Sequence, residues 1–188
     1  MAVHSSPQTV GLYDTEEVRR QAKSSIESGA VTPDYVLDLP RTHELMNEAL
    51  AAEILCVLRY RHHQVTAKGI DFPQVAEQFA EHADNEEKHM MAIATRIEQL
   101  GGNPDFNPAT VLSRAATEYG NSTTLAGMIK DDLIAERIVI EIYRQLVRWF
   151  GNDDSTSRRM FEKILADEEE HANDLADLLS VVDPRTGM

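Results

Sequence analysis

The chain has 188 residues, of which 32 are acidic and 18 basic, giving a formal net charge of −14 at pH 7. This balance disfavours a nucleic-acid partner, because binding to phosphates needs basic patches. The single cysteine, Cys56, excludes a disulfide within the chain, and no apolar run approaches the roughly 20 residues that span a bilayer. The N-terminal segment lacks the charged and apolar regions of a secretory signal. We therefore expect a cytoplasmic protein with neither a nucleic-acid nor a membrane partner.

Three parts follow one another along the chain. Residues 1–40 form a polar extension interrupted by Pro7, Gly11, Gly29, Pro33 and Pro40. Its middle, Thr15 to Ser28, can form a short helix capped by Asp14 or Thr15. We interpret this extension as an arm that packs on a neighbour or stays mobile. Residues 41–182 are predicted to form one helical domain, and residues 183–188 a C-terminal tail.

Four long helices are predicted within this domain, and no segment carries the signature of a strand. They run over Arg41–Lys68, Phe72–Leu100, Ser122–Phe150 and Ser155–Val182. At about 1.5 Å per residue, each is about 42 Å long. Only a few residues separate the first helix from the second and the third from the fourth, so each pair is expected to form an antiparallel hairpin.

The connection between the two hairpins is much longer. It runs from Gly101 to Asn121 and contains Pro104 and Pro108, and Ala109 to Tyr119 can form a short helix of its own. A connection of this length in a compact domain is either functional or a crossover. The predicted fold is therefore all-α, an antiparallel four-helix bundle with one long crossover and an N-terminal arm.

Two Glu-x-x-His tetrads stand in the second and fourth predicted helices, and a lone glutamate precedes each. Glu86 and His89 form the first tetrad, and Glu168 and His171 form the second; the lone residues are Glu53 and Glu136, 33 and 32 positions earlier. Positions i and i+3 share one face of a helix, so each tetrad directs a carboxylate and an imidazole the same way. Four Glu and two His in a bundle core are typical of a di-iron or di-manganese carboxylate site.

The position of these residues on each helix indicates that they point inward. Steps of three and four residues trace an apolar stripe along each helix, and the candidate ligands interrupt the stripes near their middles. Buried carboxylates are normally paired or bound to metal. Two divalent cations would supply +4 against the −4 of the candidates, which are Glu53, Glu86, Glu136 and Glu168.

Further residues near the candidate ligands could support them. Tyr60 and Tyr143 each follow a lone glutamate by seven positions, which favours core packing or a redox or hydrogen-bonding role. Asp132 and Asp167 could each orient a ligating histidine, with simple exposure as the alternative. His82 lies one turn before Glu86; we expect a hydrogen-bonded core histidine there, with a place on an iron route as the alternative. Surface exposure is the default for His62 and His63, of which at most one faces inward, and Cys56 is expected to fill core space.

These motifs resemble the ferritin superfamily, and bacterioferritins most closely. The matching segments are AAEILCVLRY, EEKHMMAIATRIEQLGG, DDLIAERI and ADEEEHANDL, and the likeness covers roughly residues 41–182. It implies a ferritin-like subunit of a hollow homo-oligomeric shell, with two Fe ions per subunit and Mn or Zn as substitutes. By the same resemblance, Glu53 and Glu136 would be terminal ligands, Glu86 and Glu168 bridges, and His89 and His171 one imidazole per metal.

The chain departs from the bacterioferritin pattern in two respects. The methionine that binds haem in bacterioferritins directly follows the glutamate of the second helix, and Glu87 stands here, so haem is not expected. The chain also stops soon after the fourth helix, without the short fifth helix of 24-subunit shells. We therefore favour a shell of twelve subunits over one of twenty-four. Starvation-type mini-ferritins place their metal site between subunits, whereas this sequence offers a site within one.

The resemblance implies a ferroxidase, which oxidises Fe(II) with O2 or H2O2 and deposits ferric mineral in the shell. One alternative is a di-manganese or di-iron enzyme that removes peroxide without storing iron, although a rubrerythrin-like version lacks its four-cysteine iron centre. The other alternative is a helical interaction module without catalysis, whose buried Glu and His pair among themselves.

Overall fold

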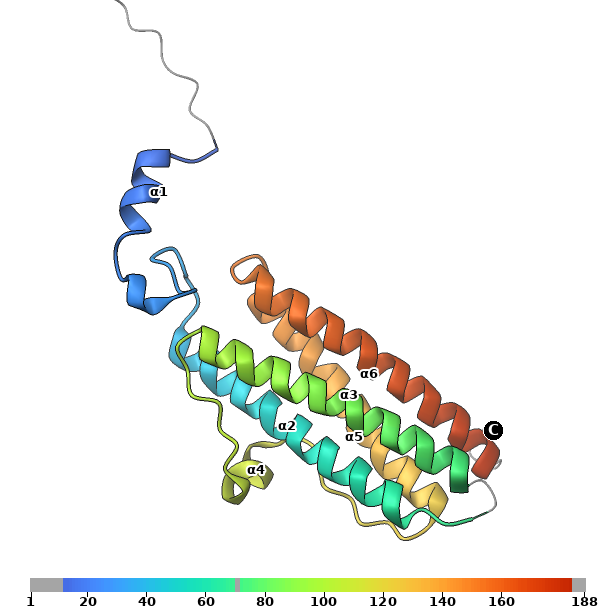
Figure 1. Ribbon diagram of the computed structural model, residues 1–188. Coiled ribbons are helices and arrows are strands. Elements are labelled where there is room, and N and C mark those ends of the chain that lie inside the picture. The colour runs from blue at the N-terminus through green and yellow to red at the C-terminus, as the bar shows by residue number, and fades with distance from the viewer. Residues whose placement is uncertain (1–11, 70–71, 184–188) are drawn as a thin grey trace, which may run out of the picture.

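The computed structural model describes residues 12–69 and 72–183, and all regular elements in these ranges are helical. In chain order they are α1 (Thr15–Gln21), the 3-10 helix η1 (Ile26–Ser28), α2 (Leu39–Thr66), α3 (Phe72–Gln99), α4 (Pro108–Arg114), α5 (Leu125–Phe150) and α6 (Ser155–Val182). Four of these, α2, α3, α5 and α6, lie side by side as a bundle, and α4 lies against the outside of α2 (Figure 1). The predicted all-α bundle with a long crossover is confirmed. None of the described helices is long and apolar enough to cross a membrane.

Side-chain caps fix where three of the long helices begin. Asp38 accepts a hydrogen bond from the Arg41 N–H (2.7 Å) at the start of α2, and Asp154 accepts one from the Ser157 N–H (2.9 Å) at the start of α6. Such caps satisfy amide groups that have no partner within the helix. Thr124 caps α5, which therefore begins three residues after the predicted start, Ser122.

The end of α3 depends on two glycines. Gly101 has a φ of +76°, a left-handed conformation that suits a residue without a Cβ atom. The N–H of Gly102 donates to the carbonyl of Ile97 (2.9 Å), which closes the last turn. A Cβ atom at Gly102 would lie 2.7 Å from Cδ2 of His43, so the crossover can leave the bundle here only with glycine.

The N-terminal arm extends beyond the end of the bundle (Figure 1). The helix predicted over Thr15–Ser28 is divided into α1 and η1, because Ser25 between them adopts a left-handed conformation with a φ of +51°. Neither piece buries a residue. Tyr35 ties the base of the arm to the bundle by donating a hydrogen bond to Asp154 (3.1 Å). Residues 1–11 of the predicted arm and 184–188 of the predicted tail lie outside the described residues.

The crossover packs across the outer face of α2. Its helix α4 ends at Arg114, so residues 115–119, predicted to be helical, are not. Val111 of α4 forms a small buried cluster with Ala51 and Leu55 of α2. As a result α2 is buried on more of its surface than its inward stripe alone requires.

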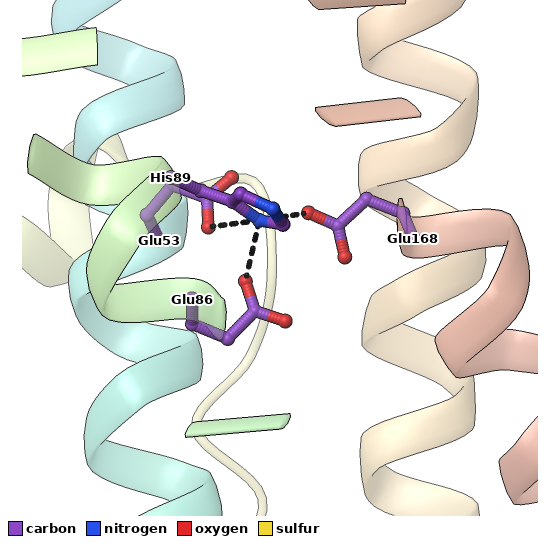
Figure 2. A group of neighbouring side chains, drawn as sticks. All are labelled: Glu53, Glu86, His89 and Glu168. Atoms are coloured by element: carbon purple, nitrogen blue, oxygen red, sulfur yellow. Dashed lines mark ion pairs between the residues drawn. The ribbon is translucent and has the colours of Figure 1, made fainter. Parts of the chain in front are cut away.

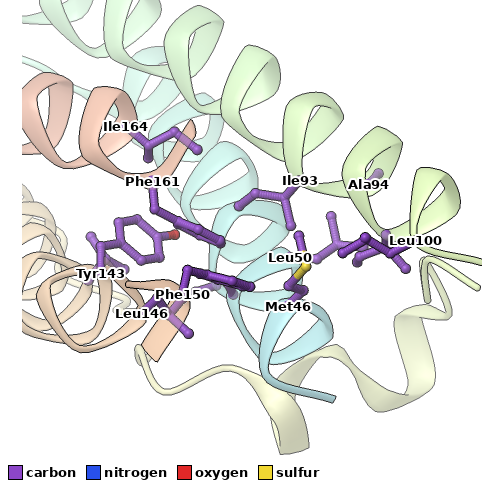
Figure 3. Close-up of a cluster of buried hydrophobic side chains, with 14 residues drawn as sticks. Met46, Leu50, Ile93, Ala94, Leu100, Tyr143, Leu146, Phe150, Phe161 and Ile164 are labelled. Atoms are coloured by element: carbon purple, nitrogen blue, oxygen red, sulfur yellow. The ribbon is translucent and has the colours of Figure 1, made fainter. Parts of the chain in front are cut away.

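Two apolar clusters fill the interior at opposite ends of the bundle. The first, drawn in Figure 3, lies where α2 and α6 begin and α3 and α5 end, and it includes Met46, Leu50, Ile93, Phe150 and Phe161. The second lies where α2 and α6 end and includes Tyr60, Val75, Phe79, Ile129 and Leu175. Between them, midway along all four helices, lies a layer of buried charged side chains.

Candidate metal centre

The six predicted ligands all lie in this central layer. Glu53 comes from α2, Glu86 and His89 from α3, Glu136 from α5, and Glu168 and His171 from α6. Each is between 0% and 5% exposed. The structure therefore brings the six residues together inside the bundle, at one depth rather than spread along its axis.

Their ligand atoms form two overlapping groups, each with all atoms within 4.8 Å of one another. One group contains Glu53, Glu86, His89 and Glu168; the other contains Glu86, Glu136, Glu168 and His171. Glu86 and Glu168 belong to both groups. Figure 2 shows the first group, in which the imidazole of His89 faces three carboxylates. Each group supplies one imidazole nitrogen and three carboxylates, a donor set that can hold a metal ion.

Both imidazoles present Nδ1 to the carboxylates. His89 Nδ1 lies 3.0 Å from Glu168 Oε1, 3.6 Å from Glu86 Oε2 and 3.9 Å from Glu53 Oε2. His171 Nδ1 lies 3.1 Å from Glu86 Oε1 and 3.3 Å from Glu168 Oε2. The two rings are nearly parallel, with centroids 6.2 Å apart.

The two tyrosines hold the lone glutamates. Tyr60 donates a hydrogen bond to Glu136, and Tyr143 donates one to Glu53. Each phenol therefore reaches the glutamate of the opposite hairpin. Both tyrosines are fully buried, so they are core residues and hydrogen-bonding residues at once.

The outer nitrogen of each imidazole also has a partner. His89 Nε2 lies 3.1 Å from Asp167 Oδ2, the contact that an orienting role requires, although the Asp167 side chain is also 38% exposed. His171 Nε2 lies 3.3 Å from the side-chain nitrogen of Asn85, a contact that the sequence reasoning missed. The repeat contained the signal, because Asn85 precedes Glu86 as Asp167 precedes Glu168.

Protons balance the buried charges of the centre in the absence of metal. Burial raises the pKa of the Glu53 and Glu136 carboxyls, and the neighbouring carboxylates raise it further. Burial also acts to raise the pKa of Glu86, but the two imidazoles beside it hold it well below its usual range. Burial disfavours a charged imidazole, yet the carboxylates that face each ring outweigh it and raise the pKa of His89 to about 12 and that of His171 to about 9.

Several ligand atoms lack any hydrogen bond, and this tests whether a metal fits. Among the buried side-chain atoms without a hydrogen-bond partner are His89 Nδ1 and carboxylate oxygens of Glu53, Glu136 and Glu168, including both oxygens of Glu168. Buried polar atoms are normally hydrogen-bonded. Atoms of this kind that converge within 4.8 Å suit divalent cations, which carboxylate and imidazole ligands accept. The residues therefore fit a metal centre.

Asp132 occupies neither of the positions that the sequence suggested for it. It is fully buried rather than exposed, and it contacts neither predicted ligating histidine. Its carboxylate accepts from Arg59 Nε (2.7 Å) and lies 2.9 Å from His63 Nδ1. Because all three side chains are buried, the expectation of a surface position for His63 is wrong.

Arg59 is the largest fully buried side chain among the described residues. It donates to the Glu118 carbonyl (3.0 Å) and to Cys56 Sγ (3.3 Å) in addition to its ion pair with Asp132. The network joins α2, α5 and the crossover. The sequence reasoning assigned no buried arginine, because a periodic pattern within one helix does not show that the crossover covers its outer face.

His82 is a buried, hydrogen-bonded histidine, as expected. It is 2% exposed, its Nδ1 lies 3.2 Å from the Tyr60 hydroxyl, and its ring stacks on that of His171 with centroids 4.1 Å apart. Burial and the neighbouring His171 lower its pKa to about 4, so the ring is neutral near pH 7. Its Nε2 faces Gln78 and Asp174, two polar residues that the sequence reasoning missed.

Comparisons with known proteins agree with this geometry. A family model described as a ferritin-like domain matches residues 43–183. The bacterioferritin of Mycolicibacterium paratuberculosis is 28% identical over 145 residues, which cover 77% of this chain and 87% of the relative. A "Nutrient stress-induced DNA-binding protein" of Synechococcus is 29% identical over 140 residues, covering 73% and 80%.

Solved structures give the same result. The bacterioferritin-related protein of Bacteroides fragilis, described as a dodecameric thioferritin, superposes with a TM-score of 0.76 at 28% identity, over 80% of this chain and 91% of that one. Dps from Thermosynechococcus elongatus superposes with a TM-score of 0.71 over 75% and 92%, and its 18% identity shows the fold alone. The predicted resemblance is confirmed, and the chain belongs to the family of proteins with a ferritin-like domain.

Proposed function

We propose that this protein is a ferroxidase that binds two Fe(II) ions per subunit in the central layer, oxidises them, and stores or detoxifies the iron as ferric mineral inside a homo-oligomeric shell. The observation that carries the proposal is the pair of overlapping ligand groups, in which Glu86 and Glu168 serve both positions. The convergent ligand atoms without hydrogen bonds and the ferritin-like family support it.

The ligands would divide into two kinds. Glu86 and Glu168, which belong to both ligand groups, would serve both ions, whereas Glu53 with His89 and Glu136 with His171 would complete one position each. Hard carboxylate oxygens suit iron, and they stabilise Fe(III) more than Fe(II). Two adjacent Fe(II) ions together release two electrons, so O2 with two protons is reduced to H2O2 without release of a one-electron product. With H2O2 as the oxidant, the same two electrons and two protons give two water molecules.

Other residues of this chain would keep the ligands in place. Tyr143 and Tyr60 hydrogen-bond Glu53 and Glu136, so one carboxylate oxygen is held while the other stays available to a cation. Asp167 contacts the outer nitrogen of His89 and favours the tautomer whose Nδ1 lone pair faces the centre. Binding of the ions would release the protons that the carboxyl and imidazole groups of the centre carry, because metal ligands must be deprotonated.

Self-assembly completes the proposal. The Bacteroides relative is described as dodecameric, and the present chain covers most of it, so we favour twelve subunits. The net charge of −14 suits attraction of cations to such a shell. Absence of a nucleic-acid partner stays a prediction, although the Synechococcus relative is named as a DNA-binding protein.

The test compares two neighbouring acidic residues of α6. Glu168→Ala removes a buried carboxylate from both ligand groups, whereas Glu170→Ala removes an exposed one. We expect Glu168→Ala to slow Fe(II) oxidation by roughly 100-fold or more, since loss of an outer partner alone costs about 10- to 100-fold. Glu170→Ala should leave the rate unchanged. Stopped-flow absorbance gives the rates, and size-exclusion chromatography with elemental analysis gives assembly and iron content.

Three results would separate the alternatives. Oxidation by Glu168→Ala at the parental rate would show that the assigned centre is wrong. Peroxide turnover by manganese-containing protein, without added iron, would favour the peroxide-removing enzyme. Purified protein without metal, and without stabilisation by Fe(II), Mn(II) or Zn(II), would favour the interaction module.

A further inference from the structure

A second cluster of polar side chains lies beside the metal centre, on the seam between α3 and α6. His82 and Gln78 of α3 face Asp174 of α6. His82 also stacks on His171, with ring centroids 4.1 Å apart. The cluster reaches solvent, because the Asp174 side chain is 43% exposed while that of His82 is 2% exposed. It therefore connects the surface to a ligand of the centre.

Hydrogen bonding fixes the tautomer of His82. Tyr60 donates its hydroxyl proton to Glu136, so its oxygen can only accept from the imidazole Nδ1 (3.2 Å). In the neutral ring the proton is then on Nδ1, and Nε2 presents a lone pair. Nε2 lies 3.4 Å from Asp174 Oδ2, which is also an acceptor. Two acceptors that face each other need a donor or a cation between them.

Gln78 supplies the donor. Its side-chain nitrogen lies 2.8 Å from His82 Nε2 and 3.0 Å from Asp174 Oδ2. Rotation of the Gln78 amide by half a turn exchanges its nitrogen and oxygen, so the oxygen then lies at these distances from His82 Nε2 and Asp174 Oδ2. The cluster then offers one nitrogen and two oxygens, separated by 2.8, 3.0 and 3.4 Å. Ligands about 2.1 Å from an ion are about 3.0 Å apart in an octahedral site and about 3.4 Å apart in a tetrahedral one, so the triangle has the size of a metal site.

The other half of the bundle provides an internal comparison. The two tetrads are 82 positions apart, and at this offset Gln78, His82 and Asp174 correspond to Met160, Ile164 and Ala92. These apolar residues line part of a groove of about 410 Å3 that reaches His89 and Asp167. The equivalent position in the other half of the bundle thus lacks these three polar side chains, although the candidate ligands of the centre are present in both halves. Helix geometry alone does not produce the polar cluster.

We propose that Gln78, His82 and Asp174 form a loading site for a divalent transition-metal cation, from which the ion passes to the centre at His171. For Fe(II) this rests on the proposed function. One nitrogen and two oxygens suit such ions, and exposure of Asp174 leaves the remaining coordination positions to water. Each loaded ion lies next to a ring that stacks on a ligand of the centre, so its transfer needs only a short movement.

Cobalt(II) binding to the full-length protein tests the site without iron oxidation. In equilibrium dialysis, we expect three Co(II) per subunit for the parental protein and two for Asp174→Asn. Asp177→Asn, an exposed acidic residue of the same helix, is the matched control and should bind three. Anomalous diffraction from Co(II)-soaked crystals should show the third ion beside His82 Nε2. Two ions at the centre and none at the seam would overturn the loading site while leaving the proposed function intact; no ion at the centre would overturn the proposed function.

Oxidation kinetics provide a second readout. At limiting Fe(II), Asp174→Asn should oxidise iron about tenfold more slowly than Asp177→Asn. Both variants lose one charge, but only the first loses a ligand of the loading site, and loss of a ligand's outer partner alone already costs about 10- to 100-fold in metal affinity. At saturating Fe(II) the two rates should converge, because the centre itself is unchanged. Gln78→Ala should behave like Asp174→Asn. Equal rates at limiting Fe(II), or a deficit that persists at saturation, would contradict a loading role.

Discussion

Replacement of Arg59 by methionine tests the buried network between α2, α5 and the crossover. The substitution keeps most of the side-chain length but leaves the Asp132 carboxylate, fully buried, with His63 as its remaining partner. Removal of one partner of a buried ion pair costs roughly 3–5 kcal/mol. For a chain of this size, 1 kcal/mol corresponds to about 2–4 °C in the melting temperature, so we expect Arg59→Met to melt about 6–20 °C lower.

The double variant Arg59→Met/Asp132→Leu should recover a large part of this loss, since an apolar pair of similar volume often replaces a buried ion pair at little cost. The unpaired His63 would retain a deficit of roughly 1–3 kcal/mol. Arg61→Met is the control, because its pair with Asp84 is exposed and worth about 1 kcal/mol or less. Thermal melting is followed by circular dichroism at fixed subunit concentration with chelator present. If Arg59→Met and Arg61→Met have the same melting temperature, the large cost assigned to breaking the buried ion pair is wrong.

Two further predictions concern the centre. The metal-free protein should lose stability as the pH rises from 6.5 to 9. The fold raises the pKa of His171 to about 9, so the protonated ring stabilises the folded state fully below pH 6.5, its usual pKa, and this stabilisation is lost as the pH approaches 9. The raised pKa values of the Glu53 and Glu136 carboxyls act in the same direction. Calorimetry across this range checks it, and a rising or flat midpoint would refute the assignment. Asp167→Ala should weaken the binding of one of the two Co(II) ions of the centre about 10- to 100-fold through His89, and leave the other ion of the centre unaffected. A titration in which both affinities of the centre stay intact would exclude this role.

Much of the bundle could be predicted because its signals are local. Helical periodicity predicted all four long helices, and the predicted bounds lie within three residues of the observed ones at each end. The clustering of the six candidate ligands was predictable because the sequence repeats them. The two Glu-x-x-His tetrads and the two lone glutamates each mark the inward face of one of the four helices. An inward face assigned wrongly on one helix would have conflicted with the other three.

The rest depends on contacts between segments that are distant in sequence. Arg59 lies off the inward stripe of α2 and contacts the crossover at the Glu118 carbonyl. His63 continues that stripe, and it lies against Asp132 of α5 and Phe79 of α3. Asp132 was assigned to the centre because it lies one turn before Glu136, yet it contacts α2 instead. Asp174 is half exposed and has no counterpart in the repeat, so periodicity gave no reason to connect it with His82.

These unrepeated residues lie on one half of the centre. Tyr60, beside Arg59, hydrogen-bonds Glu136, and His82 stacks on His171, so the polar networks surround the position of Glu136 and His171. The position of Glu53 and His89 faces the apolar cluster of Figure 3 through Tyr143 and Ile164. The groove that reaches His89 is lined by Lys88, Arg159 and Lys163 as well as by apolar residues. These positive charges repel an incoming cation, whereas the carboxylate of Asp174 attracts one. Two positions with equivalent ligands therefore have different surroundings, and the proposed loading site assigns entry of iron to the half that carries His171.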